Sequence, residues 1–78
     1  GAAMREHDYQ EALKNYRKAI DLTPSDADLY WNAAIACRSM KRDGEAATFY
    51  RRWLDLTPNA STEEGAEARR FLEARGDE

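Results

Sequence analysis

Asp21-Leu22-Thr23-Pro24 spells DLTP, and the same four letters return at Asp55-Leu56-Thr57-Pro58, 34 positions later (55 − 21). When residues 9–24 are laid over residues 43–58 without gaps, eight of the sixteen positions are identical. A short chain that repeats itself at such an interval is built from similar structural units stacked side by side. DLTP recurs because each unit must end its helix and turn the chain in the same way.

The spacing of apolar residues predicts that these units are helical. In residues 9–22 they recur at i, i+3, i+4 and i+7 and share one face of a helix, which is formed by Tyr9, Ala12, Leu13, Tyr16, Ala19 and Ile20. This helix is expected to end before Pro24, because the residue before a proline disfavours the helical region. Valine is absent from the chain, and helix formers such as Ala, Glu, Arg and Leu dominate.

Capping signals predict three further helices. Ser25 or Asp26 is expected to cap the first of these, which runs to about Met40. Asp43 is expected to cap the second, from about residue 44 to 56. The last helix is expected to begin at a capping box, Ser61-Thr62-Glu63-Glu64. Gly76 stands where a C-terminal cap is expected. Residues 2 to about 6 are expected to end an earlier helix, with a turn at His7–Asp8.

The sequence resembles the tetratricopeptide repeat (TPR) family. In the second helix of each family repeat, a small residue is followed four positions later by an aromatic residue, and a proline comes eight positions after that. This chain fits the pattern twice, first with Ala12, Tyr16 and Pro24 and then with Ala46, Tyr50 and Pro58. The places of the family's first-helix residues are held more loosely, by Tyr30, Ala33, Ala34 and Cys37. The resemblance implies one all-α domain, a short right-handed superhelix of helix–turn–helix repeats. Residues 1–24 would be a truncated first repeat, 25–58 the second, and 61–76 a C-terminal capping helix.

The resemblance also implies a concave groove that holds a peptide and is lined by the first helix of each repeat. On the expected helix 27–40, a second stripe beside the core stripe contains Trp31, Ile35 and Arg38, and Asp28 and Asn32 flank it. We expect Trp31 and Ile35 to make apolar contacts with the peptide and Asn32 and Arg38 to anchor it. The alternative is that Trp31 packs on Met4 and Arg5 of the preceding segment.

Three arginines, Arg5, Arg38 and Arg69, are expected to make one face of the groove basic and to favour an acidic peptide; the alternative is that they are simply solvated. A carboxylate clamp, which some family members use, is not expected, because Thr62 and Ala66 stand where its lysine and arginine would be.

Trp53 departs from the repeat, because its counterpart in the first copy is Ala19. A tryptophan at a position that the family fills with a small residue needs additional space. We expect Trp53 to fill the gap beneath the last helix, against Phe71 or Leu72 of its apolar stripe, which also contains Ala68.

Composition narrows the functional class. Fifteen acidic and twelve basic residues give a net charge of −3, which argues against a nucleic-acid binder. Apolar runs are too short for membrane insertion. Cys37 and His7 are each the single residue of their type, so no disulfide, metal site or catalytic constellation is expected, and no cofactor. Cysteine usage suits a reducing compartment such as the cytoplasm.

These observations predict a non-enzymatic module that binds a protein or peptide. Two alternatives remain open at this stage. The chain could be the structural C-terminal cap of a longer superhelix, or a unit of such a superhelix that associates with a second copy of itself as a homodimer. It could also be an accessory domain of a larger enzyme.

Overall fold

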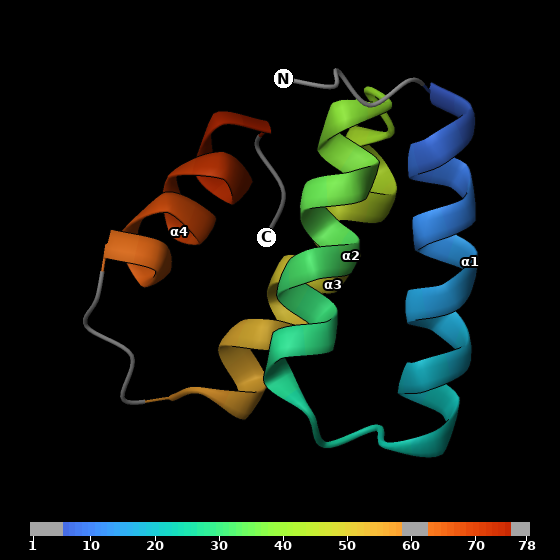
Figure 1. Ribbon diagram of the computed structural model, residues 1–78. Coiled ribbons are helices and arrows are strands. Elements are labelled where there is room, and N and C mark those ends of the chain that lie inside the picture. The colour runs from blue at the N-terminus through green and yellow to red at the C-terminus, as the bar shows by residue number, and fades with distance from the viewer. Residues whose placement is uncertain (1–5, 59–62, 76–78) are drawn as a thin grey trace.

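The computed structural model describes residues 6–58 and 63–75. These residues form four α-helices and no strand, namely α1 (Glu6–Leu22), α2 (Ala27–Ser39), α3 (Asp43–Leu56) and α4 (Glu63–Arg75). Figure 1 shows α1 beside α2, α3 behind α2, and α4 set apart on the side of the molecule away from α1. The all-α class and the succession of helices predicted from the sequence are confirmed.

The first DLTP block ends α1 and turns the chain into α2. The backbone N–H of Thr23 donates to the carbonyl of Ala19 at 2.8 Å, which closes the last turn. Asp26 is the N-cap of α2, and its side chain accepts a hydrogen bond from the backbone N–H of Asp28 at 3.1 Å. The hydroxyl of Tyr30 donates to the carbonyl of Pro24 at 2.8 Å, so the turn is tied to the helix that follows it.

A tight connection of three residues joins α2 to α3. Lys41 has a φ of 62°, in the left-handed region that usually takes glycine or asparagine. The backbone N–H of Lys41 donates to the carbonyl of Arg38, and that of Arg42 donates to the carbonyl of Cys37 at 2.8 Å. This pair of bonds is the Schellman ending of a helix, and it returns the chain in the opposite direction, so α2 and α3 form an antiparallel hairpin.

Two predicted boundaries are wrong. The N-cap of α3 is Arg42, without a side-chain hydrogen bond, and Asp43 lies in the first helical turn, where its negative charge suits the helix dipole. His7 and Asp8 do not form a turn but belong to α1, because no proline or glycine interrupts the helical pattern between residues 6 and 22. The predicted helix end before residue 6, the cap residues Ser61 and Thr62, and the cap at Gly76 lie outside the described residues.

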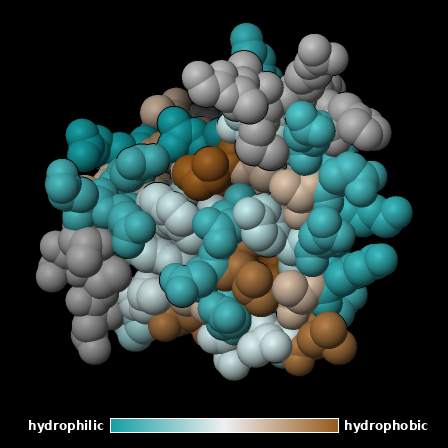
Figure 2. Space-filling model, in the orientation of Figure 1, coloured by the Kyte–Doolittle hydropathy of each residue, from teal (hydrophilic) through white to brown (hydrophobic). Residues whose placement is uncertain are grey.

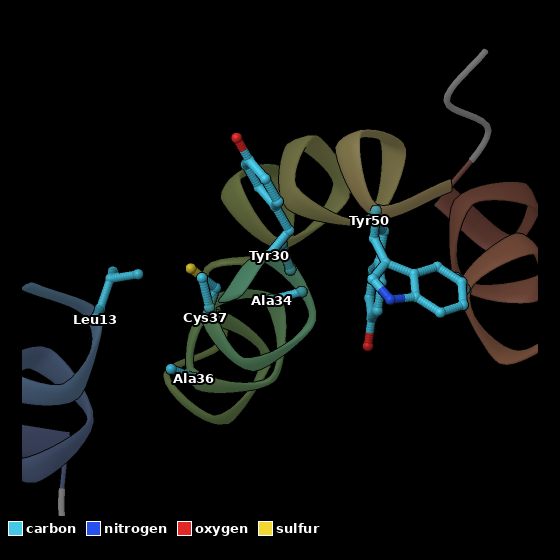
Figure 3. Packing of buried hydrophobic residues seen from close by; sticks show 10 residues of the cluster. Leu13, Tyr30, Ala34, Ala36, Cys37 and Tyr50 are labelled. Atoms are coloured by element: carbon cyan, nitrogen blue, oxygen red, sulfur yellow. The ribbon is translucent and has the colours of Figure 1, made fainter. Parts of the chain in front are cut away.

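The core runs through the helices in chain order, because α1 packs on α2, α2 on α3, and α3 on α4. Leu13 of α1 lies on one side of α2, toward Cys37, while Tyr50 of α3 lies on the other side (Figure 3). Tyr50 and Cys37 are the largest side chains that are fully buried among the described residues. The helices can approach closely because small residues fill the seams, namely Ala33, Ala34, Ala36, Ala46, Ala47 and Ala68.

Candidate functional site

The apolar stripe predicted on α2 is divided between the core and the surface. The indole ring of Trp31 is half-buried and lies edge-on to Tyr50, with ring centroids 5.3 Å apart, and 4.9 Å from the ring of Trp53. Trp31 therefore holds α2 and α3 together whatever else it contacts. The alternative contacts with Met4 and Arg5 lie outside the described residues.

Ile35, one turn further along α2, is the apolar member of the stripe that reaches the surface. Its side chain is 36% exposed. Asn32 and Asp28 are exposed beside it. On the visible face of the molecule as a whole, Figure 2 shows single hydrophobic residues separated by hydrophilic ones.

Arg38 connects three helices through one guanidinium group. Its Nη1 atom donates to the hydroxyl oxygen of Tyr50 on α3 at 3.0 Å and to Oε2 of Glu67 on α4 at 2.9 Å. Its guanidinium carbon lies 5.0 Å from the ring centroid of Phe71, also on α4, which is a cation–π distance. The hydrogen bond to Tyr50 is the main cause that raises the pKa of Arg38, whereas burial is the main cause that raises the pKa of Tyr50.

A surface hollow of about 470 Å³ opens beside this arginine. It is lined by Arg38 together with five residues of α4, namely Glu63, Glu67, Arg70, Phe71 and Ala74. No Cα atom of α4 comes within 8 Å of a Cα atom of α2 in the described ranges, so side chains alone bridge the two helices there. Figure 1 shows this separation between α4 and α2.

The predicted site residues are thus brought together only in part. Arg38 lines the hollow, but its neighbour on α4 is Arg70, while Arg69 is exposed and is not among the lining residues. Arg5 lies outside the described residues. The sequence prediction missed Glu63, Glu67, Arg70 and Ala74 and took Phe71 for a core residue only. The five lining residues of α4, from Glu63 to Ala74, follow one another at intervals of four, three, one and three positions. This spacing is the sequence signal for one face of a helix.

A family model described as tetratricopeptide repeat matches residues 2–61, which is more than half of the chain. The chain belongs to the tetratricopeptide repeat family. No curated protein and no solved structure matches it. The resemblance predicted from the repeated DLTP block is therefore confirmed. TPR domains generally act as protein-interaction modules, and the fold is typically a non-catalytic scaffold.

The TPR repeat explains why the hollow exists. Moving the five lining residues of α4 back by 34 positions gives their counterparts on α2 and at its C-cap, which are Leu29, Ala33, Ala36, Cys37 and Met40. These five residues are apolar and buried or half-buried, and four of them, all except Leu29, belong to the core cluster or pack against it. On α4, Glu63, Glu67 and Arg70 take three of these places, and charged groups are not transferred into a dry seam. The positions that are filled by apolar side chains on α2 therefore line an open hollow on α4.

The described ranges, 6–58 and 63–75, bear on three other features, namely a metal site, a membrane-spanning helix and a reactive cysteine. They contain no group of three or more His, Cys, Asp or Glu side chains arranged to hold a metal ion. None of their helices is long and apolar enough to cross a membrane. Cys37 is fully buried, and burial raises the pKa of its thiol to about 11, so the thiol stays protonated and is a poor nucleophile at neutral pH.

Proposed function

We propose that this TPR domain is a non-catalytic module that binds a peptide segment of a partner protein across α2 and the hollow-lining face of α4. The observation that carries the proposal is the hollow itself, which places the Arg38 guanidinium and the Phe71 ring on one open surface. Ile35 adds an exposed apolar side chain one turn before Arg38 on α2. Asn32 and Asp28 supply polar groups along the same helix.

In this proposal residues 25–58 are one complete TPR repeat, residues 1–24 contain the second half of another, and residues 61–76 form the capping helix. The division follows the 34-residue period, with α2 and α3 as the complete hairpin. A single complete repeat offers little contact area, so we expect modest peptide affinity.

Selection of peptides, followed by a comparison of variants, tests this function. Random short peptides displayed on phage are selected on the wild-type domain, and the affinity of each selected peptide is measured by fluorescence polarisation. Ile35→Ala is expected to weaken binding about fivefold or more, since a contact of about 1 kcal/mol is lost. Trp31→Ala is a poor test, because it also removes ring contacts with Tyr50 and Trp53.

Leu22→Ala is the matched control for Ile35→Ala. Leu22 is also an exposed apolar residue, 85% exposed, but it lies at the end of α1, outside the proposed peptide path across α2 and α4. Its substitution is expected to leave peptide affinity unchanged, and circular dichroism checks that both variants stay folded. The proposal is rejected if no peptide is selected, or if the two variants lose affinity equally.

A second candidate function is self-association through α1. Ala12, Tyr16 and Ala19 are half-buried, whereas their counterparts on α3, Ala46, Tyr50 and Trp53, are at most 5% exposed. The face of α1 that corresponds to the covered face of α3 is thus partly open, and a second copy of the chain would cover it. Sedimentation velocity tests this. A concentration-dependent dimer that Tyr16→Lys abolishes supports self-association, and a monomer at every concentration excludes it.

A further inference from the structure

Arg38 has one buried partner and one exposed partner. The ring of Tyr50 is fully buried, so its hydroxyl is a fixed acceptor for Arg38 Nη1. Glu67 lies on the surface, with 49% of its side chain exposed, and the side chain of Arg38 is 39% exposed. The Arg38–Glu67 ion pair is therefore open to solvent, whereas the Arg38–Tyr50 hydrogen bond is partly buried.

We propose that Glu67 is an internal ligand of the peptide site, which occupies Arg38 in the free protein and gives way to a carboxylate of the partner. This inference rests on the proposed function. The hydrogen bond to Tyr50 keeps Arg38 oriented toward the hollow when Glu67 turns away, so the guanidinium is ready to receive another carboxylate.

Release of Glu67 does not require α4 to leave its place. The ring of Phe71 packs on Tyr50 with centroids 5.1 Å apart, and Ala68 is fully buried in the core cluster. These contacts hold α4 on α3 independently of the ion pair. A solvent-exposed ion pair is weak, so its exchange for an equivalent pair with the partner changes affinity by only about two- to fivefold.

The other residues of the hollow define the chemistry of the partner. Arg70 lines it as a second cation, and the Phe71 ring forms an apolar wall beneath Arg38. An aspartate or glutamate next to an apolar residue in the partner peptide matches this pair of features, because guanidinium groups bind carboxylates through two parallel hydrogen bonds. Glu63 lies one turn before Glu67 and disfavours a second acidic residue at that end of the hollow.

Peptides selected on the wild-type domain, as described above, provide the probe. Glu67→Gln is expected to bind the peptides with an acidic residue about two- to fivefold more tightly at low salt, and high salt is expected to reduce the gain. Glu63→Gln removes the same charge from the same hollow but not from Arg38, so its gain should be smaller. Glu73→Gln, on an exposed part of α4 outside the hollow, should leave affinity unchanged.

Arg38 is tested separately because it joins three helices. Arg38→Gln should abolish the preference for acidic peptides, and Arg38→Lys should restore it in part, since the charge returns without the planar fork. Thermal melts followed by circular dichroism identify any variant that has unfolded. If Arg38→Gln has unfolded, the preference of Arg38→Lys for acidic peptides is the result that tests the role of Arg38.

The outcomes separate the inference from the function on which it rests. Tighter binding of acidic peptides by Glu67→Gln than by Glu63→Gln supports Glu67 as the internal ligand. If peptides bind but lack an acidic residue, or if the two glutamine variants behave alike, the inference is overturned and the peptide-binding function stands. If neither the wild-type domain nor Glu67→Gln selects any peptide, both are overturned.

Discussion

Trp53→Ala should remove a large block of core contacts from the hairpin formed by α2 and α3. Trp53 is only 5% exposed, and its ring lies 4.9 Å from that of Trp31. A buried aromatic side chain covers about 150–250 Å², which at about 25 cal/mol per Å² corresponds to about 4–6 kcal/mol. Alanine retains part of that area, so the expected loss is about 3–5 kcal/mol, as measured for comparable core truncations.

That loss is large for a chain of 78 residues, whose total free energy of unfolding should be about 4–12 kcal/mol. Thermal unfolding followed by circular dichroism should show a Tm lower by at least about 12 °C, or no cooperative transition. Trp53→Phe keeps a ring in the cavity and should lose less. A Tm within about 4 °C of the wild type in Trp53→Ala would refute the argument that this indole fills essential core volume.

Two further predictions concern stability. Asp26→Ala should lower the free energy of unfolding in urea by about 0.5–2 kcal/mol, because the N-cap bond to the Asp28 N–H is lost; Asp26→Asn, which keeps an acceptor, should lose much less, and equal losses would contradict the capping role. Burial, followed by the charge of Glu45, raises the pKa of Cys37 from 9.0 to about 11. The stability that the protonated thiol contributes is therefore complete below pH 9 and lost as the pH rises toward 11, because the unfolded state ionises first. Melts across this range should show the fall, and Cys37→Ala should show a smaller one; equal falls would assign it to other groups.

The outcome for Trp53 illustrates how far the sequence reaches. Trp53 is a large residue at the position where the first copy of the repeat has the small residue Ala19, and this difference predicted extra volume near the last helix. Trp53 is indeed buried. Its ring lies 4.9 Å from that of Trp31 on α2, a contact that the pattern did not predict, while Phe71 and Leu72 of α4 pack on the same core cluster. A one-dimensional pattern gives the size of a side chain but not the direction in which it fills space, since that depends on how two helices cross.

Arg38 shows the same limit at the candidate site. Its place on the second stripe of α2 was predictable from spacing alone, and the structure places it in the hollow. Its partners Tyr50 and Glu67 are 12 and 29 positions away along the chain, and no local rule connects them. The charged residues Glu63, Glu67 and Arg70 depart in the sequence from the apolar character of their counterparts on α2, but only the structure shows that they line one hollow.

The sequence by itself determined the 34-residue period, the helical class, the turn at each DLTP block and the TPR family, because these depend on residue spacing and backbone preferences within a few turns of the chain. Only the tertiary structure decided that Trp31 packs on the rings of Tyr50 and Trp53, that Arg38 joins three helices, and that a hollow opens beside α4. These features depend on the distance between helices, which the packing of all their side chains sets together.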